Sequence, residues 1–126
     1  AVISGRGSDE PRVSIAGEIV VTGRDFYDFE AKYQDEDSVD LIIPAKLTEA
    51  ELAEMQAIAR KAFKSLGCEG LARVDFFLTA DGFFVNEINT MPGFTPLSMF
   101  PSLWQASGVE YADLIDELIY LALNKS

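Results

Sequence analysis

The sequence predicts an α+β domain in which an antiparallel sheet is flanked by helices. The chain has 126 residues and 48% of them are hydrophobic, which is enough for a packed core and excludes a disordered chain. Two apolar segments, residues 71–78 and 83–89, are separated by a short turn, as in an antiparallel hairpin. Apolar residues repeat at helical spacing over residues 52–66 and 112–123. The length fits one domain or part of one.

The sequence of residues 1–40 predicts two strands and two loops. Residues 1–3 and 15–21 are the strands, and the turn-rich residues 4–14 between them are expected to form an exposed loop. Because a domain rarely begins inside a strand, we expect further protein upstream of residue 1. Residues 24–40 combine four aromatic residues with seven carboxylates and lack a clean period, which is typical of a loop that packs onto the rest of the protein.

The clearest helix follows a buried strand over residues 41–43. Thr48 and Glu51 have the spacing of a capping box, in which each side chain satisfies an amide at the start of the helix. Gly67 is expected to end the helix as the residue after its C-cap. The apolar residues at helical spacing between these signals are Leu52, Met55, Ala59, Ala62, Phe63 and Leu66.

Two further helices are expected near the C-terminus. The first starts near Ser98, because Pro101 is tolerated only in the first turn of a helix, and it ends at Gly108. The second covers residues 112–123. Its expected buried residues are Leu114, Ile115, Leu118, Ile119 and Ala122.

Composition excludes several classes of protein. Acidic residues outnumber basic ones by 21 to 10, a formal net charge of -11, which would repel nucleic acid. No apolar run reaches the roughly 18 residues of a membrane span. The absence of histidine excludes Ser-His catalysis and histidine-ligated zinc. The single cysteine, Cys68, cannot form an internal disulfide, and with no signal peptide we expect a cytoplasmic protein.

Polar residues interrupt the apolar hairpin at defined positions. We expect a three-residue loop, residues 80–82, with Gly82 in a left-handed conformation. The pairs that follow are Asp75 with Glu87, Arg73 with Asn89, and Phe77 with Val85. On the second strand, Val85, Glu87 and Asn89 are expected to share one face.

Two carboxylates in directly opposite positions have Cβ atoms about 4.5–5.5 Å apart and repel each other. A shared proton or a divalent cation would neutralise Asp75 and Glu87. Together with Asn89 they form a hard-oxygen set, which selects magnesium or manganese. A solvated polar face on an edge hairpin is the alternative.

Arg73 is the only cation between Lys64 and Lys125. One interpretation is that it forms a structural salt bridge to Asp75. The other is that, beside a metal, it donates hydrogen bonds to an anionic oxygen in a transition state. Downstream, two prolines and Gly93 fix a tight loop that leads to a helix N-terminus, where free amides attract anions.

Two other positions carry open alternatives. Ser98 is either a plain N-cap or a ligand of a carboxylate or phosphate. Lys32 and Tyr33, in the acidic and aromatic loop, fit the tip of a lid over a ligand, or else a surface lysine and a core tyrosine.

The chain resembles the D-alanine–D-alanine ligase family of the ATP-grasp superfamily. The matching segments are residues 17–20, 26–33, 66–68, 72–75 and 86–95, and the resemblance continues through residues 103–108. It implies that residues 1–126 are the C-terminal part of the ATP-grasp catalytic domain, with the N-terminal and central domains outside this chain. The resemblance also implies that Asp75, Glu87 and Asn89 bind a pair of magnesium ions.

The resemblance assigns roles to the remaining site residues. Arg73 and the backbone amide of Gly93 resemble the oxyanion stabilisers. Ser98, with the amide of Met99, resembles the binder of the second D-alanine's carboxylate. Lys32 resembles the lid residue that contacts the γ-phosphate of ATP, and Tyr33 resembles the lid tyrosine typical of dipeptide ligases.

The implied reaction is ATP-dependent joining of two D-alanines through an acyl phosphate, for peptidoglycan precursor synthesis, cell-wall biogenesis and cell shape. The intact enzyme is expected to be a homodimer, and the fragment alone inactive. One alternative is an ATP-grasp ligase with another acceptor, such as D-lactate. Another is a noncatalytic metal- or anion-binding module, if these residues are the whole protein.

Overall fold

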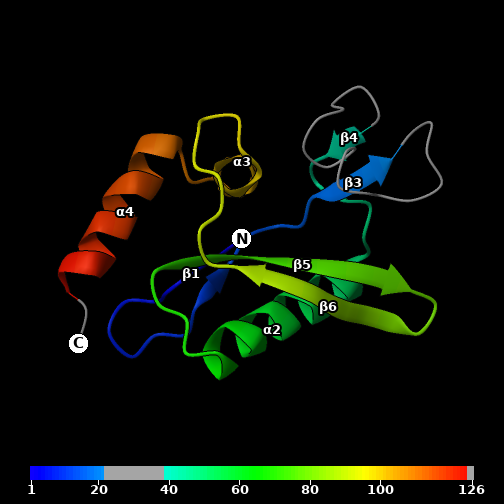
Figure 1. Cartoon of the computed structure of the whole chain (residues 1–126), viewed down its shortest axis with the longest axis horizontal. Helices are drawn as coiled ribbons and strands as arrows, with labels where there is room; N and C mark the ends of the chain where they lie inside the picture. The colour runs from blue at the N-terminus through cyan, green and yellow to red at the C-terminus, as the bar shows by residue number, and fades with distance from the viewer. Residues whose placement is uncertain (22–38, 125–126) are drawn as a thin grey trace.

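The computed structural model describes residues 1–21 and 39–124, which form two antiparallel sheets and three helices (Figure 1). The larger sheet has the strand order β2-β1-β5-β6, and its strands are β1 (Val2–Ile3), β2 (Arg12–Val13), β5 (Leu71–Thr79) and β6 (Gly82–Asn89). The smaller sheet pairs β3 (Glu18–Val21) with β4 (Val39–Ile42). The helices are α2 (Glu49–Ser65), α3 (Met99–Ala106) and α4 (Tyr111–Leu123). The predicted α+β class is confirmed.

The larger sheet lies between α2 on one side and α3 with α4 on the other (Figure 1). Side chains alternate between the two faces, so neighbouring residues of β1 enter different cores. Val2 joins the cluster beneath α2, whose buried members are Val2, Met55, Ala59, Phe63, Ala72 and Val74. Ile3 joins the cluster on the other face, with Phe100, Trp104 and Leu114. The odd-numbered residues of β5 therefore face the side that carries α3 and α4.

Helix α2 begins and ends as its sequence predicts. The Thr48 hydroxyl accepts the Glu51 N–H at 3.1 Å, and the Glu51 carboxylate accepts the Thr48 N–H at 2.9 Å. At the other end Gly67 has φ +66°, and the Cys68 N–H donates to the Phe63 carbonyl at 3.0 Å. The capping box and the glycine stop are both confirmed.

The N-terminal predictions need three corrections. Residues 4–14 are not one exposed loop, because β2 lies within them and Ser14 beyond it is only 1% exposed. The strand predicted from residue 15 begins at Glu18. Leu41, predicted to be buried, is 44% exposed, since β4 belongs to a sheet of only two strands in the part of the chain that the structure describes.

The burial predicted for α4 is correct at one residue and wrong at two. Leu114 is fully buried, whereas Ile119 is 53% exposed and Ala122 is also exposed. The helix packs along one side only, and its other apolar residues line an open groove of about 330 Å³ with Leu71 and Phe94. None of the helices in residues 1–21 and 39–124 has the length and apolar composition needed to cross a bilayer.

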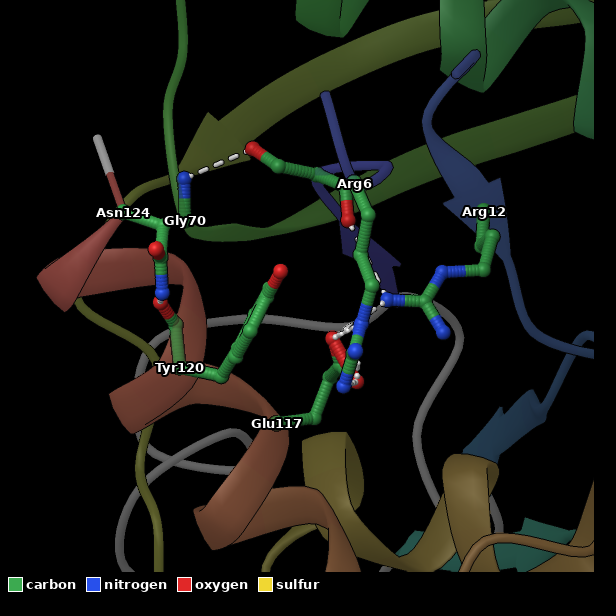
Figure 2. Close-up of polar contacts among 7 residues, drawn as sticks. Arg6, Arg12, Gly70, Glu117, Tyr120 and Asn124 are labelled. Atoms are coloured by element: carbon green, nitrogen blue, oxygen red, sulfur yellow. Dashed lines mark hydrogen bonds and ion pairs between the residues drawn. The ribbon is translucent and has the colours of Figure 1, made fainter. Parts of the chain in front are cut away.

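An ion-pair cluster ties α4 to Arg6 and to Arg12 of β2 (Figure 2). Glu117, with a side chain 13% exposed, accepts hydrogen bonds from Arg6 at 2.7–3.2 Å and pairs with Arg12 at 3.1 Å. The Arg6 guanidinium also lies 3.8 Å from the centre of the Tyr120 ring. The hydrogen bonds from Arg6, assisted by the charge of Arg12, hold the pKa of Glu117 below its ordinary value of 4.5.

This cluster predicts a pH-dependent stability. A lowered folded-state pKa means that Glu117 stabilises the fold above pH 4.5 and that this contribution is lost as the pH falls through the folded-state pKa. At pH 7 we expect Glu117→Gln to unfold a few degrees below wild type, and the difference to shrink well below pH 4.5. Thermal unfolding of the protein across pH tests this, with Asp116→Asn on the same helix as the control. A difference that stays constant with pH would contradict the prediction.

Candidate functional site

The β5–β6 hairpin places the predicted polar residues opposite one another. Asp75 pairs with Glu87 and Arg73 pairs with Asn89, as predicted. The turn is not as predicted, because Thr79 pairs with Gly82 rather than with Phe83. Gly82 does have a positive φ, of +115°.

A β-bulge explains why Asp75 still pairs with Glu87 although the turn differs from the prediction. Near the turn Phe77 faces Phe84 rather than Val85, and Val85 instead faces Phe76. The register then shifts between Asp75 and Phe76, which leaves Asn86 as the extra residue of β6. The bulge moves Val85 off the polar face, so the prediction that Val85 shares a face with Glu87 and Asn89 is wrong.

Arg73 binds the neighbouring carboxylate in a fork. Its Nε and Nη2 atoms donate to the two oxygens of Asp75 at 2.9 and 3.0 Å, and Nη2 lies 3.9 Å from Glu87 Oε1. The side chains of Arg73 and Asp75 are 18% and 25% exposed, which strengthens the pair relative to a surface one. The salt bridge that the sequence left as an alternative is therefore present. Its cation lies beside both carboxylates and offsets part of their repulsion.

The strand ends in a loop held by local hydrogen bonds. Asn89 Oδ1 accepts the Met91 N–H at 2.9 Å, which turns the chain away from the sheet toward α3. Pro92 is buried, whereas Gly93 is exposed. A Cβ at Gly93 would lie 3.2 Å from the Ser98 hydroxyl oxygen, so these two predicted site residues adjoin each other.

Ser98 is the N-cap residue of α3 by its backbone, but its side chain makes no cap hydrogen bond within the described residues. Its Oγ instead accepts the Thr95 N–H at 3.0 Å and lies 2.8 Å from Thr95 Oγ1. Ser98 is thus confirmed as the N-cap residue of α3, but the loop rather than the helix takes its hydroxyl. Within the described part of the chain, the first helical amide, that of Met99, makes no hydrogen bond.

The predicted cation site has three candidate ligands. In residues 1–21 and 39–124 no group of three or more Asp, Glu, Cys or His residues could hold a metal ion. The candidate set has two carboxylates, Asp75 and Glu87, and its third oxygen is the amide of Asn89. Lys32 and Tyr33, the predicted lid residues, lie outside the described residues.

The structure adds two residues that sequence reasoning missed. Thr95 holds the Ser98 hydroxyl, and Tyr111, the first residue of α4, donates its hydroxyl to the Phe94 carbonyl at 2.8 Å. The Thr95–Ser98 spacing is a local signal that could have indicated the first contact. The second joins residues 17 positions apart and has no local signal.

Comparison with known proteins places this chain in a family. The family model described as D-ala D-ala ligase C-terminus matches residues 1–120. The chain belongs to the D-Ala-D-Ala ligase family. The D-alanine--D-alanine ligase of Arthrobacter sp. (strain FB24) is 56% identical and aligns with 99% of this chain and 34% of its own length. That of Bacillus licheniformis is 58% identical over 94% of this chain and 33% of its own length.

Solved structures agree with this D-Ala-D-Ala ligase family assignment. The D-alanine-D-alanine ligase from Coxiella burnetii has a TM-score of 0.77 and 38% identity, over 98% of this chain and 30% of that one. A D-Ala:D-Ser ligase from Enterococcus faecalis has a TM-score of 0.78 and 34% identity, over 95% and 34%. These structures confirm the predicted fold, the C-terminal portion of ATP-grasp. The chain spans about a third of the length of the curated relatives it matches.

Proposed function

We propose that the protein containing this chain is an ATP-dependent, ADP-forming ligase that joins two D-alanines into D-alanyl-D-alanine. The observation that carries the proposal is the facing pair of Asp75 and Glu87 beside Arg73, in a chain of the D-Ala-D-Ala ligase family. The names of the curated relatives support the same activity. In this proposal residues 1–126 are the C-terminal part of the catalytic domain, and upstream domains supply the sites for adenine and the first D-alanine.

The donor set fits a divalent cation. Asp75, Glu87 and Asn89 share one face of the hairpin and present hard oxygen atoms, which suit magnesium or manganese. When bound, such cations would neutralise the phosphate oxygens of ATP. Arg73 donates one hydrogen bond to each oxygen of Asp75, and each of these oxygens keeps a second lone pair that a cation could use.

The first step transfers the γ-phosphoryl group of ATP to a carboxylate oxygen of one D-alanine. The bond from the γ-phosphorus to ADP breaks, ADP leaves and D-alanyl phosphate forms. Arg73 is the cation that this face offers to the negative oxygens, since its guanidinium lies beside both Asp75 and Glu87. Lys32 is proposed to contact the γ-phosphate from the lid.

In the second step, the amine of the other D-alanine attacks the acyl carbonyl. The carbonyl oxygen becomes negative, and we assign its stabilisation to Arg73 and the Gly93 amide. Collapse expels inorganic phosphate, and the amine loses a proton to complete the peptide bond. The Ser98 hydroxyl and the Met99 amide are proposed to hold the carboxylate of the attacking D-alanine.

A second candidate function differs only in the acceptor. The likeness to a D-Ala:D-Ser ligase structure at 34% identity favours D-serine as the acceptor to compare with D-alanine and D-lactate. Tyr33, which resembles the residue typical of dipeptide ligases, favours an amino acid over D-lactate. In either case the proposed product would serve peptidoglycan precursor synthesis in the cytoplasm.

The test uses the intact protein with ATP, a magnesium salt and D-alanine. We expect phosphate release that requires all three, loss of this release with a chelator, and recovery with magnesium or manganese. Mass spectrometry of the product separates D-alanyl-D-alanine from the D-serine and D-lactate products. Phosphate release that does not depend on D-alanine, or its complete absence, would contradict the proposal.

A further inference from the structure

One peptide unit in the loop between β6 and α3 is held at both ends. This unit joins Phe94 to Thr95. Its carbonyl oxygen accepts the Tyr111 hydroxyl proton at 2.8 Å, and its N–H donates to Ser98 Oγ at 3.0 Å. A peptide is planar, so fixing the carbonyl also fixes the direction of the N–H. The contact from α4 therefore reaches Ser98 through a single rigid group.

Ring packing supports the same contact. The Phe94 ring lies 5.6 Å from the Tyr111 ring and 5.7 Å from that of Phe100, measured between centroids. Phe100 is 1% exposed and belongs to the core cluster beneath α3 and α4. The rings hold the side of the loop, and the Tyr111 hydroxyl holds the carbonyl end of the peptide.

The hydrogen bonds around Ser98 define what its hydroxyl can offer. A serine hydroxyl has one proton and two lone pairs. Its oxygen accepts the Thr95 N–H, and the Thr95 hydroxyl lies 2.8 Å away. When Thr95 donates this second bond, both lone pairs are occupied and the Ser98 proton is left for donation to a carboxylate.

We propose that Tyr111 is a positioning residue for Ser98: through the Phe94–Thr95 peptide it orients the hydroxyl that receives the carboxylate of the second substrate. This inference rests on the proposed ligase function and adds a residue on α4 to it. Tyr111 itself does not contact the reacting groups in this proposal. It acts on the binding of the acceptor and leaves the chemical step to Arg73 and the hairpin carboxylates.

The experiment compares Tyr111→Phe with wild type in the intact protein. The variant keeps the ring and removes one neutral, part-buried hydrogen bond, so we expect the KM for the acceptor D-alanine to rise about fivefold while kcat stays within about twofold. Tyr120→Phe makes the same chemical change on the same helix, where the ring contacts Arg6, and is expected to leave both constants unchanged. Unchanged constants for Tyr111→Phe in an active enzyme would overturn the proposal.

A double-mutant cycle separates positioning from general stability. Because Tyr111 acts through Ser98, the change in kcat/KM caused by Tyr111→Phe should largely disappear in a Ser98→Ala background. An equal loss in both backgrounds would show that Tyr111 acts elsewhere and would refute this inference.

A measurement without substrate distinguishes failure of the inference from failure of the ligase function. Amide hydrogen exchange over residues 94–98 should become faster in Tyr111→Phe and not in Tyr120→Phe. Unchanged exchange refutes the positioning role whatever the protein catalyses. Faster exchange in a protein that shows no D-alanine-dependent phosphate release supports the peptide contact and refutes only its use in this reaction.

Discussion

Replacing Arg73 with alanine is expected to lower the turnover of the intact protein about 10²–10³-fold, the usual cost of losing one preorganised donor to a developing oxyanion. The structure adds a second reason. Arg73 donates to both oxygens of Asp75 and lies 3.9 Å from Glu87, so its removal takes the guanidinium away from two facing carboxylates. The measurement is magnesium- and ATP-dependent phosphate release with D-alanine.

Two further variants serve as controls for the Arg73→Ala experiment. Arg73→Lys keeps the charge but loses the fork, so we expect turnover between those of alanine and wild type. Cys68→Ser should be near wild type, since the proposed reaction uses no thiolate. Near-normal turnover of a folded Arg73→Ala protein would mean that Arg73 serves only as a structural salt bridge to Asp75.

Replacing Glu87 with glutamine is expected to lower turnover at least as much. The change is nearly isosteric, and it removes one of the two charges that the hairpin offers to a cation. We therefore also expect a higher magnesium concentration for half-maximal activity. Titrating magnesium at saturating ATP and D-alanine measures both effects.

The matched control for Glu87→Gln is Asp81→Asn. Asp81 is an exposed carboxylate at the turn of the same hairpin, and its replacement should change neither turnover nor the magnesium requirement. If Glu87→Gln kept normal turnover and the same magnesium dependence, the hairpin would have to be rejected as the cation site.

Short-range signals in the sequence determined several elements correctly. The capping box of Thr48 and Glu51 and the glycine stop at Gly67 were predictable because each depends on residues within one helical turn. The positive φ of Gly82 follows from the same kind of local chemistry. The backbone start of α3 at Ser98 was predictable from Pro101, whereas the contact of the Ser98 hydroxyl with Thr95 was not predicted although its spacing gives a local signal.

The hairpin register shows how a correct pairing of Asp75 with Glu87 can follow from an incorrect turn. A three-residue loop was predicted, whereas Thr79 pairs with Gly82 and the bulge at Asn86 restores the pairing of Asp75 with Glu87. A bulge depends on how the two strands twist and pack, and here Phe76 and Phe83 turn inward in edge contact at 5.9 Å. No single residue of β6 indicates where the bulge lies.

Local signals were enough to predict the capping of α2 and the shared face of Arg73 and Asp75, because these depend on spacing along one helix or one strand, whereas the short strand β2 was missed. Packing in three dimensions leaves Ile119 exposed and brings the Tyr111 hydroxyl to the loop before α3. Both depend on where α4 docks. That position is set by contacts between distant segments, such as the hydrogen bond from Arg6 to Glu117, which are 111 positions apart. Helical periodicity carries no information about such contacts.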